Sequence, residues 1–115
     1  MRLKSEIWVQ ALLRRTVQAG GFATVLRRGF ADAGAIHVSV RDRSGANVLL
    51  SPAPQALIEE AQTSRRAFQV VGSGLSDEQV LQAIERELRL DPDFWLIEIE
   101  GVADWTAFLD VASEA

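Results

Sequence analysis

The chain has 115 residues, of which 48% are hydrophobic and 24% charged, and its net charge is −4. These proportions are those of a folded globular protein and exclude an intrinsically disordered chain. The absence of cysteine excludes a disulfide framework, a thiol nucleophile and a zinc site built on sulfur, and it fits a reducing cytoplasm. The length predicts one domain over residues 1–115.

The N-terminal stretch "MRLKSEIWVQALLRR" starts basic, but polar residues interrupt its apolar part. That part is too short for a membrane span, and no small-residue cleavage site follows it. We therefore expect no membrane partner and a cytoplasmic protein. The spacing of Val9, Leu13 and Val17 predicts a helix over residues 6–19, with Ser5 as its N-cap and Gly20-Gly21 at its end. The near alternation of Leu3, Ile7 and Val9 leaves a strand as the alternative for the first few residues.

Three strands are predicted next. Residues 35–42 alternate between apolar and polar side chains, which is typical of a half-buried strand. Residues 23–29 and 48–51 are rich in β-branched and apolar residues, and residues 44–47 have the composition of a tight turn. We expect these strands to form an antiparallel meander that ends at Pro52 and Pro54.

The second half contains the clearest element, a helix over residues 77–90. Ser76 and Gln79 have the spacing of a capping box, and an apolar stripe follows at helical spacing. Strands are predicted at 67–71 and 94–100, and the "GSG" of 72–74 is read as a connector. Two segments stay open: 53–66 is a short helix or a loop, and 102–112 is a short final helix or a strand.

These elements predict an α+β fold with a mostly antiparallel sheet of about five strands. The N-terminal helix, the helix 77–90 and, if it forms, the short final helix would flank the sheet.

The residues that come nearest to a catalytic site are Glu98 and Glu100, which fall on one face of the strand 94–100. Their Cα atoms would lie about 6.5–7 Å apart, two strand rises. Carboxyl pairs at this separation serve glycosidases or bind hard cations, but such sites need further ligands or a buried carboxyl group. We read the pair as the solvated side of a strand that faces arginines.

His37 is the only histidine, and one histidine cannot form a metal cluster by itself. It is read as a residue of the sheet surface. The sequence therefore predicts no catalytic residues, no metal site and no cofactor. A polar ligand site is the alternative, and it requires strands 35–42 and 94–100 to be neighbours. Its residues would be His37, Arg41, Glu98 and Glu100.

Charge is distributed unevenly, since residues 1–57 carry eight basic and three acidic residues and residues 58–115 carry four and thirteen. The two halves are expected to interleave in one sheet, where opposite charges on neighbouring strands stabilise each other. A surviving basic face that binds nucleic acid is the weaker alternative, because aromatic residues of the RNA-binding kind are absent.

Three tryptophans, Trp8, Trp95 and Trp105, lie in amphipathic elements. They are expected mainly in the core, but they are also the natural anchors of an interface with another chain. Strands 48–51 and 67–71 are short and could leave a sheet edge open, which favours a homodimer.

Taken together, "RLKSEIWVQALLRR", "FATVLRRGFADAGAIHVSV", "SPAPQ" and "LRLDPDFWLIEIE" resemble the domain-of-unknown-function family 1491 of small alphaproteobacterial proteins. The resemblance covers almost the full chain in order. It implies a bacterial protein and transfers no functional residues, because the family has no established activity.

The leading hypothesis is a non-enzymatic protein-interaction or self-associating module. A small enzyme or ligand-binding protein with the polar site on the sheet is the second hypothesis, and nucleic-acid binding through the basic half is the third.

Overall fold

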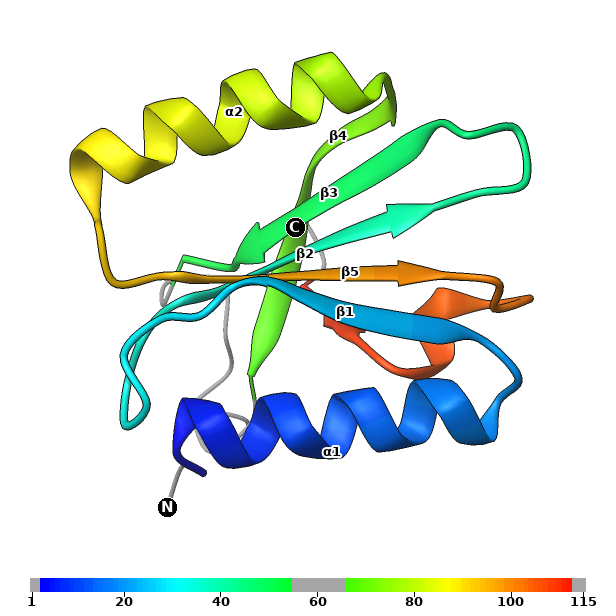
Figure 1. Ribbon diagram of the computed structural model, residues 1–115, viewed down its shortest axis with the longest axis horizontal. Coiled ribbons are helices and arrows are strands. Elements are labelled where there is room, and N and C mark those ends of the chain that lie inside the picture. The colour runs from blue at the N-terminus through cyan, green and yellow to red at the C-terminus, as the bar shows by residue number, and fades with distance from the viewer. Residues whose placement is uncertain (1–2, 55–65, 113–115) are drawn as a thin grey trace.

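The computed structural model describes residues 3–54 and 66–112. They form one six-stranded mixed sheet with one helix on each face (Figure 1). In chain order the elements are α1 (Ser5–Gln18), β1 (Phe22–Arg27), β2 (Ile36–Arg41), β3 (Asn47–Pro52), β4 (Ala67–Leu75), α2 (Asp77–Leu90), β5 (Trp95–Glu100), η3 (Trp105–Ala107) and β6 (Asp110–Val111).

Both predicted helices are confirmed, but α1 begins differently. Lys4 occupies its N-cap position and makes no side-chain cap bond. Ser5 is instead fully buried, and its hydroxyl donates to the Gly34 carbonyl at 2.7 Å. The prediction of Ser5 as a cap was therefore wrong, because a tertiary contact with the loop before β2 uses its hydroxyl group.

The start of α2 follows the sequence prediction in detail. The Gln79 N–H donates to the Ser76 hydroxyl at 3.1 Å, and the Ser76 N–H donates to the Gln79 side chain at 2.8 Å. This reciprocal capping box gives partners to two backbone N–H groups at the start of the helix, where no carbonyl of the helix can accept from them.

The strand order is β1-β5-β2-β3-β4-β6. The β2–β3 hairpin is confirmed as antiparallel, but the predicted meander is wrong, because β5 lies between β1 and β2. Trp95, Leu96, Ile97 and Ile99 of β5 are all buried. A strand that is buried on both faces needs a partner on each side and a layer above and below, so it takes a central place.

The sheet is less antiparallel than expected. β1–β5, β2–β3 and β3–β4 are antiparallel, whereas β2–β5 and β4–β6 are parallel. Residues 72–74 belong to β4, where the pairing with β3 shifts register, so "GSG" is not a separate connector.

The end of the chain does not form the short α-helix that was one of its two predicted states. Asp104 accepts from the Thr106 N–H and caps the short 3₁₀-helix η3, and β6 then pairs with β4. Most of the segment 53–66 lies outside the described residues, so its two predicted states stay untested.

The two sheet faces differ in chemistry. The face toward α1 carries the main apolar core, which includes Val9, Leu12, Ile36, Val38, Val40, Leu50, Phe68, Trp95, Ile97, Ile99 and Leu109. The face toward α2 has a smaller cluster of four buried apolar residues, Val80, Ile84, Phe94 and Leu96. Ala35 and Leu75 pack against this cluster, and the buried polar side chains of His37, Ser39 and Asn47 lie on the same face.

Candidate functional site

A row of polar side chains lies on the α2 side of the central strands. His37 and Ser39 of β2 and Asn47 of β3 are each at most 5% exposed. Burial of a polar group costs free energy unless a hydrogen-bond partner replaces water. The partners of these three side chains therefore indicate the role of the row.

His37 lies between β3 and α2. Its Nδ1 is 2.8 Å from the Ser51 hydroxyl, its Nε2 is 3.4 Å from Glu87 Oε1, and its ring contacts the Phe94 ring edge-on at 5.1 Å. A carboxylate beside Nε2 favours the tautomer with hydrogen on that atom, and the Ser51 hydroxyl then donates to Nδ1. Within the described part of the chain, Nε2 makes no hydrogen bond, so its contact with Glu87 is electrostatic only.

Serine, histidine and glutamate in contact resemble a hydrolase triad in composition. Ser51, His37 and Glu87 are absent from the linings of four cavities in the described part of the chain, and His37 itself is 5% exposed. A nucleophile needs space for its substrate, so we read the trio as a structural link between α2 and the sheet.

Burial lowers the pKa of His37 below its ordinary value of 6.5, and the nearby carboxylates of Glu87 and Asp91 oppose this shift in part. Between pH 6.5 and the lowered pKa, His37 is protonated in the unfolded chain but stays neutral in the folded chain. The free energy of unfolding is therefore unaffected by His37 above pH 6.5 and decreases as the pH falls through this window. We expect the free energy of unfolding, measured by urea denaturation across this range, to lose part of its pH dependence in His37→Asn. An unchanged pH profile in the variant would contradict this assignment.

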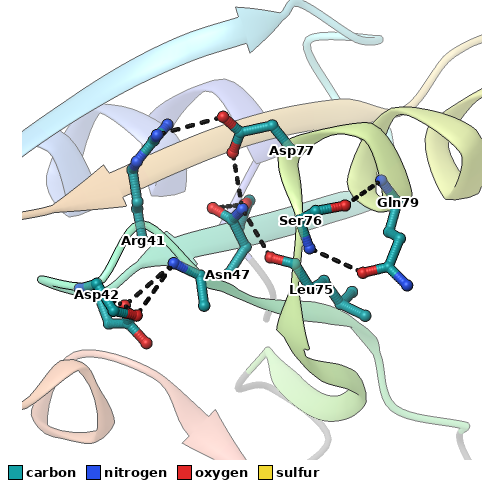
Figure 2. A network of polar contacts seen from close by, with 10 residues as sticks. Arg41, Asp42, Asn47, Leu75, Ser76, Asp77 and Gln79 are labelled. Carbon is teal, nitrogen blue, oxygen red and sulfur yellow. Dashed lines mark hydrogen bonds and ion pairs between the residues drawn. The ribbon is translucent and has the colours of Figure 1, made fainter.

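A second polar network fixes the start of α2 to the β2–β3 hairpin (Figure 2). Asp77 forms an ion pair with Arg41 at 3.2 Å and accepts from the Asn47 side chain at 2.9 Å. Asn47 also donates to the Leu75 carbonyl at 3.1 Å. One carboxylate thus bridges both strands of the hairpin, which indicates that this network orients the helix.

The structure brings together part of the predicted ligand site. β2 and β5 are neighbours, with Ser39 beside Glu98 and Arg41 beside Glu100. Glu98 is half-buried and Glu100 is exposed, but Arg41 is paired with Asp77 and not with either of them. His37 is covered by α2, so its reading as a sheet-surface residue was wrong.

A groove of about 210 Å³ runs between α2 and the sheet. Its apolar lining comes from Leu26 of β1, Leu96 of β5, and Val80, Leu81 and Ile84 of α2; its polar end is formed by Ser39, Arg41, Asn47, Asp77 and Glu98. Of the predicted ligand residues, Arg41 and Glu98 reach this groove, whereas His37 and Glu100 do not line it.

β1 is an edge strand of the sheet, and no other strand of the described residues pairs with its outer side. Its pattern alternates: Ala23 and Val25 pack on the α1-side core, whereas Phe22 and Leu26 are 68% and 51% exposed. The predicted open edge at strand 48–51 was wrong, because β3 lies inside the sheet. On β4, β6 pairs only with Ala67 and Phe68.

The three tryptophans are not equivalent. Trp95 is 1% exposed, so in this fold it offers no surface to a partner. Trp8 and Trp105 are half-buried and pack against the main core. Their interface role stays a prediction, and for Trp95 it is incompatible with its burial.

Several basic residues of the first half have acidic partners. Lys4 pairs with Asp32 at 3.6 Å and Arg28 with Glu6 at 3.2 Å, both within that half, whereas Arg41 pairs with Asp77 of the acidic half. No helix among residues 3–54 and 66–112 is long and apolar enough to cross a membrane. In the same ranges, no group of three metal-ligating side chains comes together.

Similar structures cover nearly the whole chain. A solution structure of a protein from A. tumefaciens is 40% identical, covers 99% of this chain and 98% of its own, and superposes with a TM-score of 0.83. A crystal structure and an NMR structure of a DUF1491 family protein from Caulobacter crescentus CB15 are each 37% identical and cover 98% of this chain, and 100% and 99% of their own. Both superpose with a TM-score of 0.77.

Among proteins with curated descriptions, none matches this chain. The model of the family described as "Protein of unknown function (DUF1491)" matches residues 3–110. Since this match spans most of the sequence and the similar structures share the fold, the chain belongs to the DUF1491 family.

Proposed function

We propose that this protein is a non-enzymatic cytoplasmic interaction module that associates with a second copy of itself through the open edge of β1. The observation that carries the proposal is the row of exposed, uncharged side chains on this edge strand.

Edge strands that remain single are normally protected by lysine, proline or an inward charge. From Phe22 to Leu26 the strand has none of these, and two of its large apolar side chains face water. The one irregularity is a register shift between Val25 and Arg27, near the end of the strand. The backbone before it has the regular pairing that the addition of another strand requires.

The two alternatives have less support. A ligand site that uses His37 would require α2 to leave the sheet, because the imidazole is buried below it. Nucleic-acid binding would draw on the basic residues of the first half, and three of these, Lys4, Arg28 and Arg41, already contact carboxylates.

Sedimentation equilibrium from micromolar to millimolar concentration tests the proposal. We expect the natural chain to form a dimer, and Phe22→Glu to weaken it by about tenfold or more, since a carboxylate would have to lose its water in an otherwise apolar contact. Val71→Glu is the matched control, because Val71 is 51% exposed on β4 and lies outside the proposed interface.

A chain that stays monomeric at millimolar concentration would overturn the proposal. Equal weakening by Phe22→Glu and Val71→Glu would also count against β1 as the interface.

A further inference from the structure

We infer that two copies pair their β1 strands about a two-fold axis at Thr24, which places Phe22 of each copy against Leu26 at the mouth of the partner's groove. This inference rests on the proposed self-association and adds its register and the occupant of the groove.

The first step is a constraint of strand geometry. Directly opposite residues of an antiparallel pair point to the same face of the sheet. In a symmetric pair of identical strands, one residue must therefore lie opposite its own copy. For the regular part of β1, the residue on the axis is Ala23, Thr24 or Val25.

The second step compares these three registers. With Thr24 on the axis, Phe22 lies opposite the partner's Leu26 in both halves of the interface. With Ala23 on the axis, Phe22 lies opposite Thr24 of the second copy. With Val25 on the axis, Phe22 lies opposite Arg28 of the second copy and so passes Leu26. Only the first register covers both exposed apolar side chains, Phe22 and Leu26, with each other, and it places two threonines opposite each other, which is a favourable cross-strand pair.

The third step concerns the sheet face. Phe22 pairs with Glu100, which pairs in turn with Arg41, and Arg41 contacts Asp77 of α2, so Phe22 is on the α2 face. Leu26 is on this face too, because it lines the groove together with residues of α2. The partner's Phe22, opposite Leu26, therefore reaches the groove where Leu81 is 57% exposed.

Charge complementarity supports the antiparallel pairing of the two β1 strands. Arg27 lies over the Phe94 ring at 5.0 Å, which places it on the α2 face, and Glu100 on that face is exposed. The antiparallel arrangement separates the two Arg27 side chains to opposite ends of the interface. It brings each of them to the end where the partner carries Glu100, for which no ion pair is found within the described ranges.

Single-cysteine variants test the register cleanly, because the natural chain has no cysteine. Ala23→Cys, Thr24→Cys and Val25→Cys would each be oxidised, or treated with a short bis-maleimide, under conditions in which sedimentation measures the dimer. We expect Thr24→Cys to form a covalent dimer at least about tenfold faster than the other two, since paired Cβ atoms lie about 5 Å apart only for the residue on the axis. Val71→Cys on β4 is the background control.

The contact of Phe22 with the partner's groove is tested by substitutions of residues on α2. Leu81→Glu is expected to weaken the dimer by about tenfold through the cost of burying a charge, and Leu88→Glu, an exposed residue of α2 that does not line the groove, is expected to leave the dimer unchanged. A dimer that cross-links at Ala23 or Val25, or at none of the three, would overturn the register while self-association stands. Equal dimerisation of Leu81→Glu and the natural chain would overturn the groove contact, and a monomer throughout would overturn both proposals.

Discussion

Trp95→Ala is expected to lower the free energy of unfolding by about 4 kcal/mol, or on the order of 15–25 °C in Tm for a domain of this size. Trp95 is among the largest fully buried side chains and belongs to the main core between α1 and the sheet. Its removal leaves a cavity, and it also leaves the Phe30 carbonyl without the indole N–H that donates to it at 2.9 Å. Urea unfolding followed by circular dichroism measures this loss.

Trp105→Ala is the control for Trp95→Ala, because Trp105 is half-buried at the edge of the same core. Its loss is expected to be clearly smaller. Similar losses for both variants would contradict the central place of Trp95, and so would a loss below about 1 kcal/mol for Trp95→Ala.

Gly34→Ala is expected to cost about 3 kcal/mol by overpacking. A Cβ atom at Gly34 would lie 2.5 Å from the Asp93 carbonyl oxygen and 2.8 Å from both the nitrogen and the oxygen of Phe30. These neighbours are backbone atoms, and hydrogen bonds from Phe30 to Asp93 and from Gly34 to Phe30 hold them in place. The loop between β1 and β2 therefore cannot move aside to accept a methyl group. Thermal unfolding of the variant measures the cost.

Gly20→Ala separates this effect from ordinary glycine strain. Gly20 has a φ of +87° and no atom within 4 Å of an added Cβ, so its replacement is expected to cost only about 1 kcal/mol of backbone strain. If Gly34→Ala costs no more than Gly20→Ala, close packing is not the reason for the glycine at position 34.

The sequence predicted the elements whose signals are local. The capping box at Ser76 and the alternation of residues 35–42 are set by neighbours in the chain, and both are confirmed. The position of β5 depends on pairing with segments that are more than fifty residues away in the chain, which no local pattern encodes. Its signal was the nearly continuous apolar run at 94–97, which is more typical of a central strand than of an edge.

The contacts of His37 show the same limit. The alternation of the strand placed His37 correctly on the face opposite Ile36 and Val38. The prediction that this face is exposed to solvent was wrong, because α2 covers it at His37. The partners Ser51 and Glu87 come from β3 and α2. Glu87 lies on the less exposed side of the helix, next to Ile84 in the helical repeat, and that position was the one signal that a carboxylate points toward the sheet.

The small apolar contact and the few polar contacts that hold α2 have a consequence for partial opening of the fold. Helix α1 is joined to the rest by a large apolar contact, whereas α2 relies on a cluster of four apolar residues and on a few bonds of Asp77 and Glu87. Such bonds lose little when water replaces them. A partial opening that releases α2 alone should thus require less free energy than global unfolding, and the amide protons of this helix should exchange with solvent long before those of the strands that it covers.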